Sequence, residues 1–290
     1  MHAVSRGYRV FQTVNAVILT GVVVVTLYPF INIIARSFSA ESQIRAGEVN
    51  LWPKGFNLTT YKIIATDGMF WRNYGNTVLY TVVGTAVAMA LTTVYAYVLS
   101  KKDLKGRGVL IGIAVFTMFF SGGLIPNYVL ISSLGMKNSL WAIVVPNAIS
   151  VFNLLVMKAF FESLPSELEE AAQIDGLSTY GILFRIVLPL SKAVIATMTL
   201  FYAVSFWNSW FSAFLYLDKA ELLPVTVYLR NLIAGASGGV SAGADTEQLS
   251  QVAANIQSVT IVLTALPILC VYPFVQRYFV SGVMLGAVKG

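Results

Sequence analysis

Acidic side chains gather in one short segment of this chain, SELEEAAQIDG, although only 11% of its 290 residues are charged. Five acids fall between Glu162 and Asp175, with small residues among them. Leu168, Ala171 and Ala172 have the i, i+3, i+4 spacing that places side chains on one face of a helix. The glutamates can pair with basic groups, and the alanines permit close approach by another surface. The segment is therefore either a docking element for another protein or a solvated amphipathic linker.

The residues that flank this segment predict where its helix begins and ends. Pro165 should end the preceding helix, Ser166 should be the N-cap, and Glu169 should complete a capping box. Gly176 is expected near the C-terminal cap, where a left-handed residue is common. Ser178 should cap a second short helix. The sequence thus predicts a helix–turn–helix.

Residues capable of nucleophilic or metal chemistry are scarce. The chain has one histidine, His2, and one cysteine, Cys270, so it can form no intramolecular disulfide and has no Cys–His pair for catalysis. We expect no metal site and no catalytic residue. The phosphate-loop pattern GxxxxGK[ST] does not occur in the sequence. The chain is therefore predicted to bind no cofactor and not to be an enzyme.

A second group of polar residues lies in an apolar stretch. Thr197, Phe201, Ser205 and Asn208 recur at helical spacing, with Trp207 beside them. Aromatic rings stack on the apolar faces of sugars, and hydroxyl and amide groups bind sugar hydroxyls, so this face suits a sugar pathway. The alternative is ordinary helix–helix packing, in which Ser, Thr and Asn also bond across helices.

The elements that position these residues must lie in a membrane. Hydrophobic residues make up 57% of the chain and its mean hydropathy is +0.75, which is too apolar for a soluble domain of this size. A spanning helix needs about 20 apolar residues. We therefore expect an all-α membrane protein with six transmembrane helices, near residues 11–35, 76–99, 109–133, 139–161, 187–215 and 256–277.

The distribution of basic residues predicts the orientation of these helices. The sequence KKDLKGRG at 101–108 joins the second and third predicted spans and should lie in the cytoplasm. Both chain ends then lie inside, and the net charge of +6 sets orientation rather than marking a nucleic-acid-binding protein. We expect one domain over 1–290, with a cytoplasmic loop at about 162–186 and longer outer segments at 36–75 and 216–255.

Two further features of the spans bear on function. SGGLIP at 121–126 and Pro146-Asn147 should interrupt the third and fourth spans. The predicted spans contain no Asp or Glu, which argues against a proton-coupled carrier, because such carriers use intramembrane carboxylates or histidines. Sodium coupling through backbone carbonyls stays open.

The acidic segment resembles the EAA motif of binding-protein-dependent ABC importer permeases. Glu170-Ala171-Ala172, Gly176, Ile186 and Leu188-Pro189 match its spacing, EAA, three residues, G, nine residues, I, one residue, LP. AAQIDG is the form typical of carbohydrate permeases, and MFFSGGLIPNY and FYAVSFWNSWF resemble permeases for complex oligosaccharides. The resemblance covers nearly the whole chain.

This resemblance implies a function and a set of partners. The chain would form half of the pathway of an ATP-driven importer of sugars or oligosaccharides, with alginate oligosaccharides as one candidate. It would work in a bacterial cytoplasmic membrane with a second permease subunit, two ATPase subunits that use ATP and Mg²⁺, and an extracytoplasmic sugar-binding protein. A permease for another solute and a stand-alone secondary carrier are the alternatives. The coupling helix that docks on the ATPase would use Glu169, Glu170, Ala171, Ala172, Asp175 and Gly176.

Overall fold

The computed structural model describes residues 6–236 and 255–270 of the chain. Within these residues the regular structure is entirely helical. The chain divides into two compact units: Met1–Gly68 with Leu229–Pro267, here called unit 1, and Met69–Tyr228 with Ile268–Gly290, here called unit 2. The all-α class is therefore confirmed.

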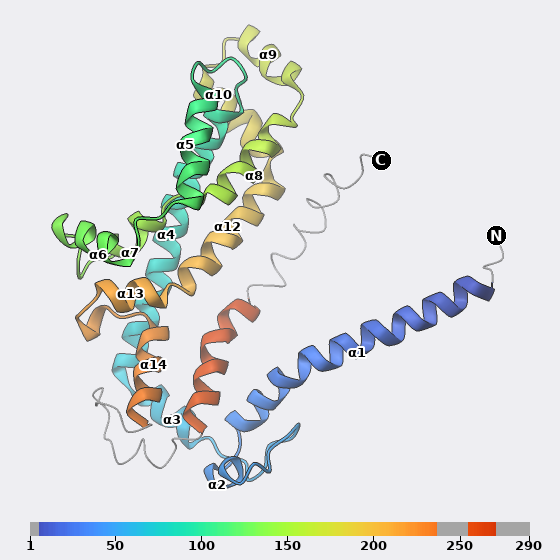
Figure 1. Cartoon of the computed structure of the whole chain (residues 1–290), viewed down its shortest axis with the longest axis vertical. Helices are drawn as coiled ribbons and strands as arrows, with labels where there is room; N and C mark the ends of the chain where they lie inside the picture. The colour runs from blue at the N-terminus through green and yellow to red at the C-terminus, as the bar shows by residue number, and fades with distance from the viewer. Residues whose placement is uncertain (1–5, 237–254, 271–290) are drawn as a thin grey trace. The chain divides into compact units, whose positions relative to one another are not determined.

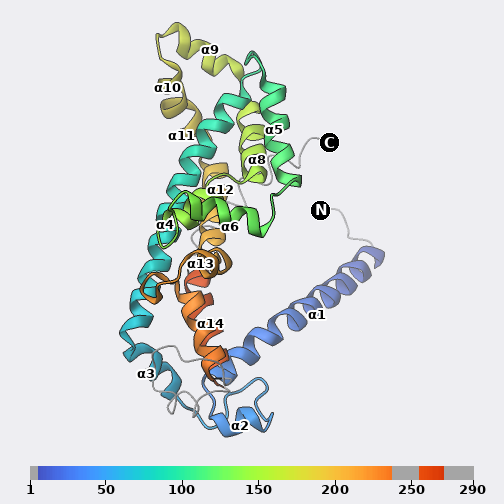
Figure 2. The ribbon, with the colours of Figure 1, turned by 60° about the vertical axis from the view of Figure 1, so that its left-hand side comes forward.

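Unit 2 is built on one long helix, α4 (Gly68–Ser100), which is 33 residues long. The shorter helices that follow run back and forth along it (Figures 1 and 2). In chain order they are α5 (Arg107–Phe119), α6 (Leu124–Ser133), α7 (Trp141–Val144), η1 (Val145–Asn147), α8 (Val151–Glu162), α9 (Ser166–Ile174), α10 (Thr179–Ile182), η2 (Leu183–Val187), α11 (Leu188–Leu190), α12 (Lys192–Trp207), α13 (Trp210–Tyr216) and η3 (Ala220–Leu222).

Two helices of the described chain are long and apolar enough to cross a membrane alone, Val10–Ser37 and Gly68–Ser100. Three pairs of consecutive helices also qualify if each bent pair counts as one span, which gives up to five candidate membrane spans. They are Arg107–Phe119 with Leu124–Ser133, Trp141–Asn147 with Val151–Glu162, and Thr179–Leu190 with Lys192–Trp207. The predicted sixth span is described only as far as the helix Asn255–Cys270.

The predicted interruptions of spans three and four are confirmed. The chain bends by 114° between α5 and α6, where Gly123 has φ +89°, a conformation that side chains with a Cβ avoid. It bends by 51° between η1 and α8, at residues 148–150, directly after Pro146, which lacks the backbone N–H that an α-helix would use at that position. A third bend of 86°, between α11 and α12 at Ser191, was not predicted.

Helix α12 packs against α4 at a glycine. A Cβ on Gly84 would lie 2.7 Å from the ring of Phe206, which is 2% exposed. Helices in a membrane associate through such close packing, since lipid provides no hydrophobic force between them. Nearer its start, α4 binds the segment before α14 (Val225–Ala236): Asn76 and Tyr80 donate to backbone carbonyls between 221 and 223, and the Val225 N–H donates to Thr77.

Unit 1 joins α1 (Arg6–Ser37) to a small cap with α2 (Glu41–Arg45) and α3 (Thr59–Thr66). Buried Asn255 holds the end of α1, because its Nδ2 lies 2.9–3.2 Å from three backbone carbonyls between residues 36 and 39. Phe38 stacks on Phe56 and Tyr61. The predicted outer segment at 36–75 thus contains α2 and α3, and the predicted outer segment at 216–255 contains α14. Residues 237–254 of the latter lie outside the described residues.

We expect Gly84→Ala to destabilise the folded chain by about 1–3 kcal/mol, because the added methyl group displaces the Phe206 ring from a packed site. Thermal unfolding of the purified protein in detergent measures the effect. Gly75→Ala is the matched control on the same helix, where a Cβ meets nothing within 4 Å. An equal loss of stability in both variants would contradict the packing explanation.

Candidate functional site

The acidic segment forms α9 at one end of unit 2, beside the turn from α4 to α5 (Figures 1 and 2). The predicted capping box is wrong. The helix begins at Ser166, its N-cap residue is Pro165, and the cap makes no side-chain hydrogen bond. The Glu169 carboxylate pairs instead with Lys101. Lys101, from another part of the chain, thus binds the Glu169 carboxylate that the capping box would have used.

The end of α9 follows the sequence prediction closely. Gly176 has φ +80°, and its N–H donates to the carbonyl of Gln173 at 3.0 Å, while the Leu177 N–H donates to that of Ala172 at 3.0 Å. These two bonds form a Schellman motif, in which a left-handed glycine satisfies the last carbonyls of a helix. Ser178 then caps α10 by accepting a hydrogen bond from the Gly181 N–H at 3.2 Å.

The residues assigned to ATPase docking lie on different sides of α9. Ala172 is 4% exposed and packs into the core of unit 2. Glu169 is half-buried, whereas Glu170, Ala171 and Asp175 are exposed, as is Gly176. Glu170 forms no ion pair with any residue in the part of the chain that the structure describes. The outer face of α9 therefore presents a carboxylate and a small residue together.

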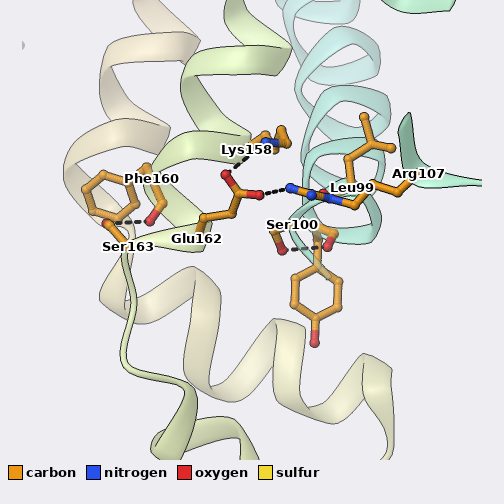
Figure 3. Close-up of polar contacts among 8 residues, drawn as sticks. Leu99, Ser100, Arg107, Lys158, Phe160, Glu162 and Ser163 are labelled. Carbon is orange, nitrogen blue, oxygen red and sulfur yellow. Dashed lines mark hydrogen bonds and ion pairs between the residues drawn. The ribbon is translucent and has the colours of Figure 1, made fainter. Parts of the chain in front are cut away.

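A cluster of charges holds the helix ends beneath α9 (Figure 3). Glu162, at the end of α8, pairs with Arg107 at the start of α5 and with Lys158, whose Nζ lies 2.8 Å away. Arg107 also donates through Nε to the carbonyl of Leu99 at 2.7 Å. One guanidinium thus connects the ends of α4 and α8. The sequence prediction treated Arg107 only as an orientation signal and missed its pairing with Glu162, which lies 55 residues away in the chain.

A cavity of about 240 Å³ lies between the break at Pro146 and the middle of α12. Its lining combines aromatic and neutral polar groups: Pro146, Asn147, Ile149, Ser150, Asn153, Phe201, Tyr202 and Ser205. Two of the five predicted pathway residues, Phe201 and Ser205, belong to it. The lining contributed by α8 was not predicted, although the Pro146-Asn147 interruption marked its position.

The other three predicted pathway residues do not line this cavity. Thr197 is half-buried and donates to the carbonyl of Ala193. Asn208 is exposed at the end of α12. Trp207 is 7% exposed and packs edge-on against Tyr74 of α4, with ring centroids 5.8 Å apart. Trp207 therefore has a packing role in this chain, whatever it contacts in an assembly.

The hydroxyl of Tyr202 joins three helices at the wall of the cavity. It lies 2.6 Å from Thr92 Oγ1 on α4 and accepts a hydrogen bond from the Ser150 N–H at 2.9 Å. The Ser150 N–H lies next to the Pro146 break, where helical bonding is interrupted. Tyr202 thus satisfies a backbone donor that the break leaves unpaired.

Lys137 and Asp218 connect the α6–α7 turn to the end of α13. Lys137 Nζ lies 3.1 Å from Asp218 and 2.8 Å from the Tyr128 hydroxyl. The hydrogen bond to Tyr128 and the pairing with Asp218 raise the pKa of Lys137. The hydrogen bonds from Lys137 and Asn138 lower the pKa of Asp218. Both groups therefore stay charged across the neutral range.

Comparison with known sequences identifies a family. Residues 107–285 match the family described as "Binding-protein-dependent transport system inner membrane component". This range contains α9, the cavity and the cluster of charges around Glu162. It includes the EAA-like spacing on which the sequence resemblance was based.

Individual relatives extend the similarity to the whole chain. Protein LplC of Bacillus subtilis is 42% identical and aligns over 100% of this chain and 98% of its own length. A polygalacturonan/rhamnogalacturonan transport system permease, YtcP of B. subtilis, is 42% identical over 92% and 93% of the two chains. A crystal structure of a bacterial ABC transporter involved in the import of the acidic polysaccharide alginate superposes with a TM-score of 0.86. Its chain is 34% identical, and the match covers 96% of this chain and 100% of that one.

We expect Tyr202→Phe to destabilise the chain by about 1–3 kcal/mol, because it leaves the Ser150 N–H unpaired in a part-buried place. The loss in the double variant with Thr92→Val should be smaller than the sum of the single losses, since both residues share one hydrogen bond. Thermal unfolding in detergent gives the comparison. Tyr180→Phe, at a ring that is 72% exposed, is the control and should change stability little. Additive losses would contradict the shared bond.

Proposed function

Because the chain belongs to the family of binding-protein-dependent transport system inner membrane components, we propose how it works as the permease subunit of an ABC importer of oligosaccharides. A permease of this kind is a transport subunit rather than an enzyme. ATP hydrolysis, with its Mg²⁺, belongs to two partner ATPase subunits. A second permease subunit encloses the other half of the pathway, and an extracytoplasmic binding protein delivers the sugar.

The exposed acidic face of α9 carries this proposal. Glu170 and Ala171 are exposed on α9, and α9 lies beside the turn that follows α4 (Figure 1). A carboxylate beside small residues can enter a groove on another protein and pair with a cation there. The Schellman motif at Gly176 fixes the direction in which the chain leaves α9. Helix α9 therefore has the features of a rigid coupling helix.

The orientation follows from the same end of the molecule. The turn beside α9 (Figure 1) contains four basic residues: Lys101, Lys102, Lys105 and Arg107. Basic residues between spans favour the cytoplasmic side. An ATPase docked on α9 is then cytoplasmic, in agreement with the charge rule. We assign the chain to a bacterial inner membrane, with six spans and both ends inside.

The substrate is proposed to be an oligosaccharide that carries acidic groups. The cavity combines the Phe201 ring with Asn147, Ser150, Asn153 and Ser205, which suits a sugar ring and its hydroxyl groups. YtcP is described as a polygalacturonan/rhamnogalacturonan transport system permease, and the similar solved transporter is involved in the import of the acidic polysaccharide alginate. Polygalacturonan, like alginate, is a polymer of sugar acids. ATP-driven closure of the ATPase pair would move α9, and the bundle would alternate between states open to either side.

We expect Glu170→Lys to abolish transport while leaving the amount of inserted protein nearly unchanged. The exposed carboxylate would be replaced by a cation facing the basic site of the ATPase, and like charges repel. Copurification of the ATPase with this chain, followed by ATP-driven uptake in vesicles, measures the effect. Glu167→Lys is the matched control, because it makes the same charge change at another exposed acid of α9. Wild-type uptake by the Glu170 variant would remove the coupling assignment.

Phe201→Ala and Asn208→Ala should each lower the uptake of alginate oligosaccharides while the ATPase still copurifies. Loss of a stacking ring or of a hydrogen-bonding amide in the pathway should cost roughly 1–3 kcal/mol of sugar binding. Uptake rates over a range of oligosaccharide concentrations separate this effect from poor assembly. Thr199→Ala is the control, because Thr199 is exposed but lies off the face of α12 that Phe201 and Asn208 share, two residues and about 200° from Phe201. Unchanged kinetics in both variants would reject this face as the pathway.

A further inference from the structure

We propose that Glu169 and Glu170, although adjacent, have separate roles, and that the Glu169–Lys101 ion pair transmits the movement of α9 to α4 inside this chain. Glu169 is then a positioning residue rather than a contact for the ATPase. This inference rests on the proposed function of α9 as the coupling helix. It changes the role that the sequence resemblance implied for Glu169.

The geometry of α9 separates the two acids. Successive residues of a helix point about 100° apart, so Glu169 and Glu170 cannot face the same surface. The Glu169 side chain is 18% exposed and pairs with Lys101, whose own side chain is 35% exposed. Glu170 is exposed. A partner protein that reaches Glu170 therefore finds the neighbouring carboxylate already paired.

Lys101 is itself fixed to the end of α4. Its Nζ lies 4.1 Å from the centroid of the Tyr97 ring, a distance typical of a cation–π contact. Tyr97 is 4% exposed and packs edge-on against Phe161 of α8. Ala172 of α9 belongs to the same core cluster as Tyr97. Helix α9 is thus joined to the end of α4 by an ion pair, and it shares with α4 the apolar core cluster of this end of unit 2.

The end of α4 is joined in turn to two other helices. Arg107 bonds to the Leu99 carbonyl and pairs with Glu162, which also receives Lys158 (Figure 3). These bonds make the ends of α4, α5 and α8 one block. The Glu169–Lys101 pair is the ionic connection between α9 and that block within the described residues.

Helix α4 extends from this block to the cavity. Thr92 of α4 contacts the Tyr202 hydroxyl, which binds the Ser150 N–H at the cavity wall. A displacement of α9 can therefore reach the cavity through Lys101, α4 and Tyr202 in sequence. Each step is a contact between packed or hydrogen-bonded groups, which is the physical requirement for coupling between distant sites.

The test uses the complete transporter in lipid vesicles, with alginate oligosaccharides as the probe. Glu169→Gln and Lys101→Gln each remove one charge at nearly constant size. We expect the ATPase to copurify at the wild-type level, and the oligosaccharide moved per ATP hydrolysed to fall roughly 2- to 30-fold. The exchanged pair Glu169→Lys with Lys101→Glu should recover transport relative to Glu169→Lys alone. A purely structural role would lower the amount of assembled complex instead.

Three outcomes would overturn the proposal: a wild-type transport ratio in Glu169→Gln, loss of ATPase binding in that variant, or no recovery in the exchanged pair. Glu167→Gln is the matched control, because it removes a charge from the same helix at an exposed position. Absence of ATPase binding to the wild-type chain would refute the proposed function instead.

A second readout does not depend on the sugar. In a Cys270→Ser background, the Ser205→Cys variant reports access to the cavity through maleimide labelling. Trapping the transporter with ATP and vanadate should change the rate of maleimide labelling in the protein that carries Cys270→Ser and Ser205→Cys. Adding Glu169→Gln to that protein should abolish the change. An equal response in both proteins would also overturn the proposal.

Discussion

The close contact between Phe206 and the Cα of Gly84 determines how α12 lies along α4, and the functional parts of unit 2 depend on that alignment. A membrane gives helices no hydrophobic reason to associate, so such contacts hold the bundle together. With α12 in this position, Tyr202 reaches Thr92 and the Ser150 N–H. The same alignment puts Phe201 and Ser205 opposite the Pro146 break. The missing side chain at one glycine therefore underlies the geometry of the cavity.

Helix α4 makes a different kind of contact in each part of its length. Its first half carries polar side chains that bind the backbone before α14. Its middle holds Gly84 and Thr92, which contact α12. Its end carries Tyr97 and Lys101 beside α9. A 33-residue helix without a proline can act as one rigid body over this distance, and proline is the commonest cause of a kink.

The sequence predicted the local features well, because their causes are local. Gly176, Ser178, the SGGLIP bend and the Pro146 break each depend on the backbone preferences of a few neighbouring residues. The capping box failed for a reason that no local pattern contains, since Glu169 meets Lys101, which lies 68 residues away in the chain. The bend at Ser191 and the α8 side of the cavity were also missed. Trp207 illustrates the same limit, because helical spacing placed it beside the polar face but not against Tyr74.

The sharp turn between α5 and α6 has a consequence for the bilayer. The 13 residues of α5 rise about 20 Å, whereas the hydrocarbon layer is about 30 Å thick. If α5 begins at the membrane surface, as the distribution of basic residues predicts, the backbone of residues 120–123, exposed in this chain, lies at a depth at which lipid offers no hydrogen bonds. Irregular backbone at such a depth is tolerated only against protein or trapped water. On this topology the turn would face the interior of the assembled transporter, and lipid would disfavour the subunit when it is alone.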